Sequence, residues 1–360
     1  MKKIKLFDPV SGISEKNAVI KVLNSHFWAS GEGNGNVKKF EDKFSKYVSA
    51  KDSVAVNSGT AALNLALSML DIENKEVILP SLSFVSTAHS VIINGGKPVF
   101  ADIDPNTMCL DPEQIKKLIS KNTKVILPVH FGGMPSNLKK IKEICDSYNL
   151  SLIEDAAHAA GSCFDNRKIG SHGDMVCFSF HPVKNLAMPT GGLITINTSD
   201  FKQTKKILNS KRWCGITNRK NSIYDVKELG WNYYMNEFSA TIGLIQLRNL
   251  EKFNKIRKII ARKYVENILV DQKMPFDKNC SYHLYWILVK NRKNFRKKMF
   301  DKGIETGIHY NPIHQMTMYK KNIKLPITEE IGKKIVSIPL HPNLNDYEVE
   351  KITKYVNMFS

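Results

Sequence analysis

The most constraining feature of this sequence is a regular alternation, between residues 53 and 198, of short apolar runs with longer segments of helical periodicity. Such an alternation is typical of right-handed crossovers between the strands of a mostly parallel sheet. We therefore predict an α/β fold in which helices flank a central sheet. The expected strands are 53–56, 76–79, 98–101, 124–128, 151–153, 175–180 and 193–196, and the helices between them are 61–69, 85–93, 111–119 and 138–148.

The segments outside this alternation are more mixed. Helices are expected before it, over 15–23 and 37–47. We predict a large domain over residues 1–250 and a smaller C-terminal α/β domain over 251–360. The elements expected after residue 198 are helices over 200–211, 236–253 continuing into 255–268, 295–302, 328–336 and 345–356, a strand over 282–289, an extended piece over 338–342 and a polar loop over 213–225.

Five loops at the carboxyl ends of the expected strands are where a ligand is predicted to bind. Open parallel sheets bind ligands beyond these strand ends. Four of the loops carry side chains whose chemistry suits a binding site. The five loops are 57–60, 80–84, 130–133, 155–158 and 179–184.

The first loop, Asn57-Ser-Gly-Thr-Ala-Ala62, lies between an expected strand and an expected helix. Gly59 allows the backbone to turn, and the free N–H groups at a helix start can bind a phosphate. Ser58 precedes this glycine, and Thr60 can add its hydroxyl. The same residues also suit an ordinary helix cap, so this loop alone does not decide between the two roles.

Two acidic residues and a histidine lie at the end of another expected strand, in Ile153-Glu-Asp-Ala-Ala-His158. A buried carboxylate needs a cationic partner or takes up a proton, so Asp155 would suit a protonated ring nitrogen. A helix N-cap is the alternative role for this aspartate. His158 is compatible with a core position, a helix surface or a ligand contact.

A single lysine stands in the turn-rich loop between the expected strands 175–180 and 193–196. Lys184 has apolar neighbours, and a lysine in a partly apolar pocket loses its proton more readily and can act as a nucleophile or base. Ser179 offers a hydroxyl at the edge of the same loop. Phe84, in an earlier loop, could stack on a flat ring, although a core position is commoner for a lone phenylalanine.

The features of these loops indicate a function only when they are taken together. A phosphate-binding turn, a stacking aromatic ring, an acid for a ring nitrogen, a serine and an activated lysine together describe a cradle for pyridoxal 5'-phosphate (PLP). Each feature alone is weak. Their order on successive loops is difficult to attribute to chance, so PLP is the predicted cofactor.

The composition argues against several other classes of protein and of site. Six scattered cysteines without a CxxC pair indicate neither a zinc site nor a disulfide framework, so no metal is expected. No window resembles a membrane span and the N-terminus lacks a secretory signal, so a cytoplasmic location is expected. The net charge of +19 fits nucleic-acid binding, an anionic substrate or a lysine-rich bias; we favour the bias, because lysines are spread along the whole chain.

Longer motifs are spread over nearly the whole chain. They are Phe40-Glu41, Asn57-Ser-Gly-Thr-Ala-Ala-Leu63, Pro80-Ser-Leu-Ser-Phe-Val85, Pro98-Val-Phe-Ala-Asp-Ile-Asp104, Glu154-Asp-Ala-Ala-His158, Phe178-Ser-Phe-His-Pro-Val-Lys184, Gly191-Gly192, Gly230-Trp-Asn-Tyr233, Gly243-Leu-Ile-Gln-Leu247 and His309-Tyr-Asn-Pro-Ile-His314. This combination resembles the DegT/DnrJ/EryC1/StrS family of PLP-dependent sugar aminotransferases, which have the aspartate aminotransferase fold. The resemblance implies that fold, with a large and a smaller C-terminal domain.

The resemblance also implies roles for the candidate residues. Lys184 would be the catalytic residue, which forms a Schiff base with PLP and moves the proton, and Asp155 would pair with the ring nitrogen. Asn232 would reach the phosphate of a neighbouring subunit, so a homodimer with shared active sites is expected. The other implied contacts are Ser58, Gly59, Thr60 and Ser179 at the phosphate, Phe84 and His158 beside the ring, and His309 and His314 near the entrance for the sugar nucleotide.

The implied reaction transfers an amino group from L-glutamate to a nucleotide-linked keto sugar, with PLP and pyridoxamine phosphate alternating. A 4-keto-6-deoxy sugar is expected, to give an amino sugar for cell-surface polysaccharide or glycan biosynthesis, and a 3-keto sugar is the nearest competing acceptor. The family also contains dehydratases with histidine in place of the lysine, so Lys184 favours transamination. A PLP-dependent dehydratase is the competing activity, and a non-enzymatic regulator or nucleic-acid binder is a more distant possibility.

Two positions depart from the family's pattern. Met188-Pro-Thr-Gly-Gly192 stands where Gly-Glu-Gly-Gly or Gly-Asp-Gly-Gly is common, and Tyr234 stands where many members carry arginine. The first departure changes the loop beside the lysine, and the second removes a cation near the site. Both concern the substrate rather than the cofactor.

Overall fold

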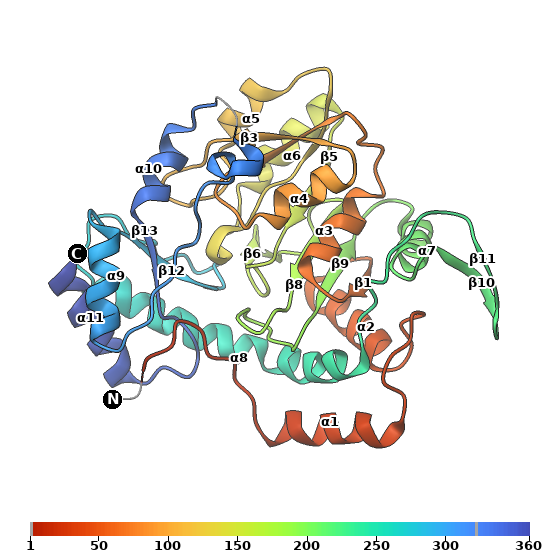
Figure 1. The fold of residues 1–360 in the computed structure, drawn as a ribbon, viewed down its shortest axis with the longest axis horizontal. Coiled ribbons are helices and arrows are strands. Elements are labelled where there is room, and N and C mark those ends of the chain that lie inside the picture. Colours follow the sequence, from red (N-terminus) through yellow and green to blue (C-terminus); the bar gives the residue numbers. More distant parts are fainter. Residues whose placement is uncertain (1–2, 321–322) are drawn as a thin grey trace.

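The computed structural model describes residues 3–320 and 323–360, and it contains the predicted α/β fold (Figure 1). A seven-stranded sheet lies at its centre. Its strands follow the spatial order β1 (Asp52–Val56), β9 (Gly192–Ile196), β8 (Met175–Ser179), β5 (Ser151–Asp155), β4 (Thr123–Ile126), β2 (Glu76–Pro80) and β3 (Lys97–Ala101). β9 runs antiparallel to both neighbours, and the other pairs are parallel. The prediction of a mostly parallel sheet is therefore confirmed.

Both faces of this sheet are covered, which is why its strands are continuously apolar rather than alternating. Consecutive side chains of a strand point to opposite faces. Val54 of β1 packs in one core cluster with α3 residues such as Leu65, whereas its neighbour Ala55 packs in another cluster with Phe40 and Phe44. The helices that precede or separate the strands are α1 (Ile13–Ser25), α2 (Asn36–Val48), α3 (Gly59–Leu67), α4 (Ser86–Ile93), α5 (Pro112–Leu118) and α6 (Leu138–Tyr148), and α7 (Phe201–Lys211) follows β9.

Most buried apolar side chains of the C-terminal part belong to one cluster, to which the sheet region adds residues such as Leu82, Ile103 and Phe131. The long helix α8 (Glu237–Asn267) runs along the molecule and links the two regions (Figure 1). Residue 250 lies inside this helix, and the division into domains 1–250 and 251–360 stays a prediction. The other elements of this part are the antiparallel strands β12 (Tyr285–Leu288) and β13 (Ile335–Ile338), and the helices α9 (Arg292–Asp301), α10 (Pro326–Lys334) and α11 (Asp346–Phe359).

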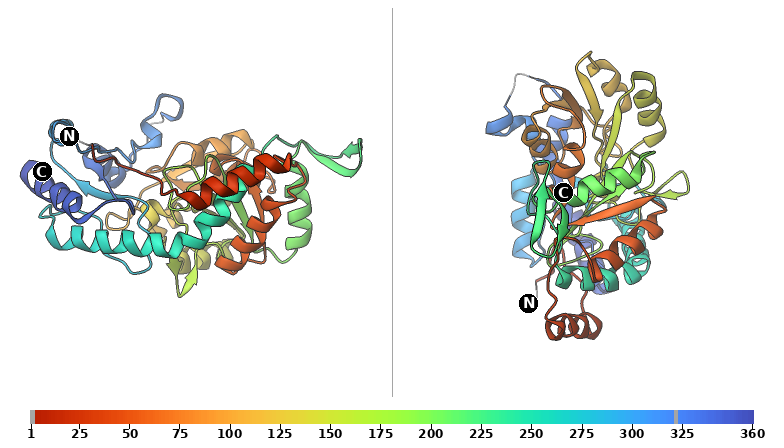
Figure 2. Two further views of the ribbon diagram at one scale, coloured as in Figure 1. Left: turned by 90° about the horizontal axis from the view of Figure 1, so that it is seen from below. Right: turned by 90° about the vertical axis from the view of Figure 1, so that its right-hand side faces the viewer.

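The predicted polar loop over 213–225 is wrong. Strands β10 (Ile216–Lys220) and β11 (Ile223–Val226) pair there as an antiparallel hairpin, which projects from the body of the molecule (Figures 1 and 2). Asn221, with a φ of 56°, occupies the left-handed conformation that a tight hairpin turn requires. Most side chains of the hairpin are exposed on both faces, so the sequence lacks the apolar alternation by which a strand is recognised.

The boundary of the predicted helix over 328–336 is also wrong at its C-terminal end. α10 ends at Lys334, and the β-branched pair Ile335 and Val336 begins β13, which pairs with β12. The extended piece expected over 338–342 therefore starts three residues too late. Strand pairing outweighs the helical periodicity here, because both residues are fully buried against the partner strand.

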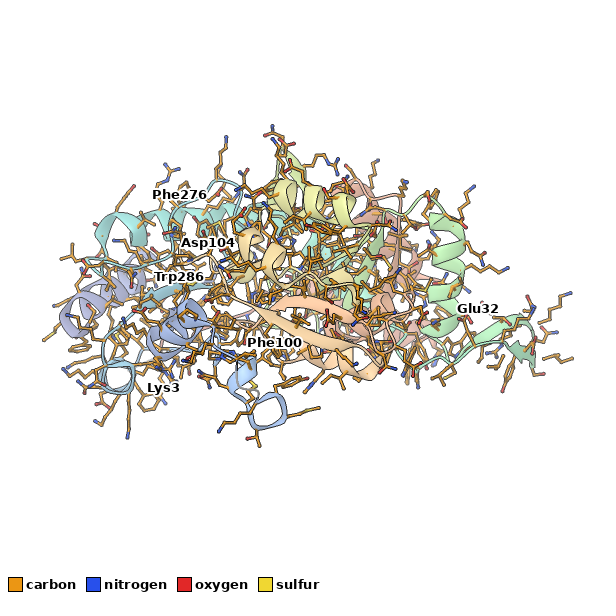
Figure 3. The ribbon with its side chains drawn as sticks, turned by 90° about the horizontal axis from the view of Figure 1, so that it is seen from above. Lys3, Glu32, Phe100, Asp104, Phe276 and Trp286 are labelled. Carbon is orange, nitrogen blue, oxygen red and sulfur yellow. The ribbon has the colours of Figure 1, made fainter. Side chains whose placement is uncertain are left out.

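The molecular surface carries many cationic side chains. Their nitrogen-tipped ends project from helices and loops around the molecule (Figure 3). This distribution agrees with the lysine-rich bias that the sequence indicates. Within the described residues, no helix combines the length and the apolar character that crossing a bilayer would demand.

Candidate active site

A cavity of about 440 Å³ opens where the predicted strand ends meet. It brings together nine of the residues singled out in the sequence, from loops far apart along the chain. Additional lining comes from Tyr310, His181 and Thr190, among others. The nine predicted residues are Ser58, Gly59, Thr60, Phe84, Asp155, His158, Ser179, Lys184 and His309.

Two predicted residues lie outside this lining. Asn232 is exposed, and its carbonyl oxygen accepts a hydrogen bond from the Asn57 side chain at 3.3 Å. His314 is 3% exposed, and its Nδ1 lies 2.7 Å from the hydroxyl of Ser81. The structure therefore does not bring the His314 side chain to the cavity of its own chain.

One end of the cavity is formed by the start of α3. Ser58 is the N-cap, and its hydroxyl accepts a hydrogen bond from the Ala61 N–H at 3.1 Å. A Cβ on Gly59 would lie 2.7 Å from the Cβ of Ser179, so only glycine allows the helix start to approach β8 this closely. The first N–H groups of α3 and its positive dipole end therefore face Ser179, and this narrow, hydroxyl-lined place fits a phosphate.

Asp155 ends β5 with its side chain buried, 4% exposed. One carboxylate oxygen accepts from the Thr87 hydroxyl at 2.8 Å and the other from the Ala157 N–H at 3.1 Å. Burial raises the pKa of this carboxyl, while the two hydrogen bonds and the nearby Lys184 cation oppose the rise. Turns rather than a helix follow Asp155, so the alternative role as a helix N-cap is wrong.

Lys184 lies in the tight loop between β8 and β9. Backbone bonds shape this loop: the Lys184 N–H donates to the His181 carbonyl, and the Met188 N–H to the Phe180 carbonyl, both at 2.8 Å. Burial lowers the pKa of the Lys184 amine to about 8, and the Asp155 carboxylate partly opposes this shift. The Lys184 side chain lines the cavity, where its amine can meet a ligand.

This lowered pKa predicts the pH dependence of cofactor uptake. Only a neutral amine can attack the PLP aldehyde, and an ordinary lysine stays protonated until about pH 10. With a pKa of about 8, the reactive fraction of Lys184 rises between pH 7 and 9 and then levels off. We expect the rate at which the apoprotein takes up added PLP, followed by stopped-flow absorbance, to rise about tenfold from pH 7 and to plateau above pH 9. A rate that still climbs steeply at pH 10 would contradict the lowered pKa.

His158 and Phe84 both line the cavity. His158 is buried, and burial lowers the pKa of its imidazole well below the usual value, so the ring is neutral. Phe84 is 56% exposed, which makes its alternative role as a core aromatic residue wrong. Its ring centroid lies 6.1 Å from that of Tyr310.

Three residues that support this site were not predicted from the sequence. Thr87 donates to Asp155 from the first turn of α4, and Tyr310 bonds His158 at 3.0 Å. The Thr190 hydroxyl donates to the Asn57 carbonyl, which joins the lysine loop to the start of α3. Tyr310 lies next to His309 inside a motif of the family, so its hydroxyl could have been recognised from the sequence. Thr87 carries a hydroxyl within an apolar helix, and such a position by itself suggests no function.

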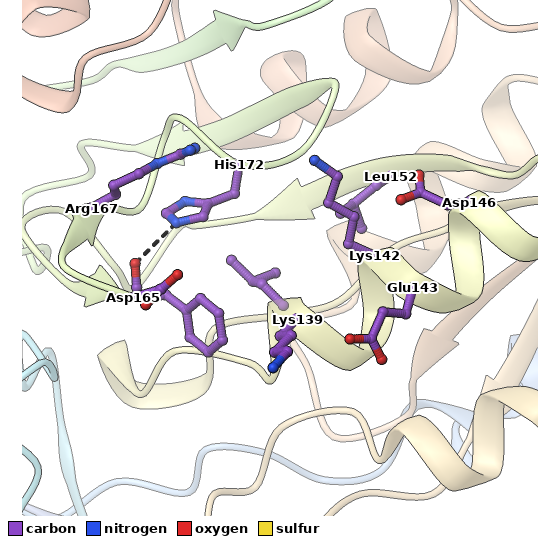
Figure 4. A pocket seen from close by; sticks show the side chains of 10 residues that line it. Lys139, Lys142, Glu143, Asp146, Leu152, Asp165, Arg167 and His172 are labelled. Carbon is purple, nitrogen blue, oxygen red and sulfur yellow. Dashed lines mark hydrogen bonds between the residues drawn. The ribbon is translucent and has the colours of Figure 1, made fainter.

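A second cavity, of about 290 Å³, lies between α6 and the short hairpin of β6 (Cys163–Phe164) and β7 (Arg167–Lys168) (Figure 4). Its wall carries cations such as Lys142 and Arg167 beside acids such as Glu143 and Asp146. It shares no lining residue with the cavity of Lys184. Its mixed charges favour neither an anionic nor a cationic ligand.

A mostly parallel α/β sheet that presents a reactive lysine, a buried carboxylate and an anion-binding helix start at one edge defines the class of protein: a PLP-dependent aminotransferase. The comparison with known proteins specifies it further. The chain belongs to the DegT/DnrJ/EryC1/StrS aminotransferase family, whose sequence profile matches residues 11–357. The predicted family, the PLP cofactor and the sugar aminotransferase activity are therefore confirmed.

Relatives match over nearly their full length. GDP-perosamine synthase of Escherichia coli O157:H7 is 33% identical, with 100% of this chain and 99% of the relative covered. The dTDP-4-dehydro-2,3,6-trideoxy-D-glucose 4-aminotransferase of Saccharopolyspora spinosa is 30% identical, with 97% and 94% covered. Among solved structures, Helicobacter pylori PseC, an aminotransferase involved in the biosynthesis of pseudoaminic acid, superposes with a TM-score of 0.93 at 27% identity over 99% of both chains.

Proposed function

We propose that this enzyme transfers the amino group of L-glutamate to a nucleotide-linked 4-keto-6-deoxy sugar. The names of two relatives, a GDP-perosamine synthase and a 4-aminotransferase of a dTDP-linked sugar, support a nucleotide-linked acceptor, and the second supports amination at carbon 4. The product would be an amino sugar for cell-surface polysaccharide or glycan synthesis, such as O-antigen. Such synthesis from soluble precursors agrees with the cytoplasmic location that we propose.

We further propose how the residues of this chain contact PLP. Gly59, Thr60 and Ser179, with the N-cap Ser58, hold the phosphate at the start of α3, and Asp155 receives the protonated ring nitrogen, which neutralises its buried charge. Bound PLP supplies an aldehyde for amines and a ring that stabilises negative charge. Lys184 supplies the amine that holds the cofactor, and then gives and takes protons at the reacting carbon, for which a pKa of about 8 is suited.

We propose that the active enzyme is a homodimer with shared active sites. The projecting β10–β11 hairpin supports this, because it exposes Ile223 at 79% and is followed by Leu229 at 77% exposure. Apolar side chains of this kind are stabilised by burial against a second chain. Asn232 follows the hairpin and is exposed, which suits a contact with the phosphate in the neighbouring subunit.

The single observation that carries this function is the presence of the partly buried Lys184 amine in one cavity with the buried Asp155 carboxylate. The test is incubation of purified enzyme with 15N-labelled glutamate and a panel of 3-keto and 4-keto sugar nucleotides, with products identified by mass spectrometry. We expect label in the sugar, with 4-keto acceptors converted at least tenfold faster. Preferred labelling of 3-keto acceptors would identify the other regiochemistry, and loss of water without label would identify a dehydratase.

A further inference from the structure

One short segment of the C-terminal part of the chain, residues 309–314, contacts two of the loops that line the cavity. Its Tyr310 bonds His158, and its His314 bonds Ser81 in the loop that carries Phe84. The family resemblance implies that His158 and Phe84 flank the PLP ring, and the present inference rests on the proposed function.

The first contact holds the His158 ring at both nitrogens. The Gly132 N–H donates to Nδ1 at 3.1 Å, so in the neutral ring the proton is on Nε2. Nε2 then donates to the Tyr310 hydroxyl oxygen at 3.0 Å. The two rings lie with their centroids 6.0 Å apart and their planes inclined by 26°. Rotation of the imidazole would break both hydrogen bonds, and the His158 side chain is buried whereas Tyr310 is half-buried at the cavity.

The second contact ties the same segment to the Phe84 loop. Ser81 is fully buried, and its hydroxyl lies 2.7 Å from Nδ1 of His314 and accepts from the His314 N–H at 3.1 Å. The Ser81 carbonyl accepts from the Ile313 N–H at 2.9 Å. Ser81 lies three residues before Phe84, so these three bonds fix the base of the loop whose tip carries the exposed ring.

We propose that Tyr310 and His314 are positioning residues, which orient His158 and Phe84 on the two sides of the space for the cofactor ring. Tyr310 acts by its hydrogen bond to His158, and His314 acts through Ser81. The role differs from the substrate contact that the family resemblance implies for His314. A gap whose width is set before the ligand arrives reduces the entropy lost on binding.

The test compares the variants Tyr310→Phe, His314→Leu and His314→Asn with Tyr319→Phe. Tyr319 is a matched control, because its hydroxyl also bonds a histidine, His89, but outside the cavity. Asparagine at 314 keeps a hydrogen-bonding atom near the position of Nδ1. The measurements on the apoprotein are proton exchange of the His158 ring by NMR with 15N-labelled histidine, and hydrogen–deuterium exchange of residues 80–88 by mass spectrometry. PLP dissociation constants are measured by absorbance.

In Tyr310→Phe we expect exchange of the His158 N–H to accelerate at least tenfold and PLP affinity to fall about 2- to 10-fold, the value of one hydrogen bond. In His314→Leu, exchange in residues 80–88 should accelerate and PLP affinity fall by a similar factor, whereas His314→Asn and Tyr319→Phe should remain within twofold of the parent.

Unchanged exchange in the apoprotein variants would overturn the positioning roles whether or not PLP binds. Faster exchange with unchanged PLP affinity would overturn the link to the cofactor and leave the proposed function intact. A parent protein that takes up no PLP would instead overturn the proposed function.

Discussion

Replacement of Lys184 with alanine is expected to abolish amino transfer and to remove the visible absorbance of the bound cofactor. Among the lysines that the structure describes, Lys184 alone has an amine whose pKa burial lowers strongly. Its side chain lies in one cavity with Asp155. Loss of a catalytic nucleophile typically lowers turnover by about 10³-fold or more. Absorbance spectra of the purified protein before and after treatment with borohydride, with labelled-glutamate assays, measure both effects.

Two further variants test whether the reactive amine, rather than a positive charge, is what the site needs. Lys184→Arg keeps a cation near Asp155, but a guanidinium is not deprotonated, so it should be as inactive as the alanine variant. Lys168→Ala removes a lysine that pairs with Glu251 at the surface, and it should leave spectrum and activity unchanged. An alanine variant at 184 that kept the cofactor band would show that another group holds the cofactor.

The sheet and the main cavity were predictable because local signals identify them. Apolar strands end in glycine, hydroxyl or acidic residues, and parallel strands bring those ends to one edge. Asp155 and Lys184 could be recognised for that reason, 29 positions apart in the sequence but in one cavity. The exposed β10–β11 hairpin was missed because neither of its faces is buried. A strand shows alternating apolar and polar residues in its sequence only where one face is buried.

The supporting contacts could not be predicted, because their partners are distant in sequence. Tyr310 and His158 are 152 positions apart, and Thr87 and Asp155 are 68 positions apart. A hydroxyl has no preferred partner that composition or spacing would reveal. The Phe40-Glu41 motif is a further example. It fits the family pattern, but the role of Glu41 becomes clear only from the position of Arg212 in the structure.

The Glu41–Arg212 pair, which lies outside the cavity, is predicted to make a large contribution to stability. The two side chains are each 1% exposed and joined at 2.6 Å. Glu41 also accepts from the Ala55 N–H at 2.8 Å, and Arg212 donates to the Ala55 and Glu32 carbonyls at 2.9 Å each. The pair therefore binds α2 and the segment after α7 to β1, whose end leads directly into Ser58.

We expect Arg212→Met to destabilise the protein by about 3–5 kcal/mol, because it leaves the Glu41 carboxylate buried without its cation. Denaturant unfolding followed by circular dichroism would measure the loss. The double variant Glu41→Leu with Arg212→Met should lose clearly less than the sum of the single changes, since no charge is then left buried.

The exposed pair Lys263–Asp346, joined at 2.7 Å, provides the control for charge pairing as such. Lys263→Ala should have almost no effect, because solvent screens that pair. If Arg212→Met were as mild as Lys263→Ala, the buried pair would not be what holds β1 in place. If the double variant instead lost the full sum, the stabilisation would come from the separate hydrogen bonds to Ala55 and Glu32 rather than from the joined charges.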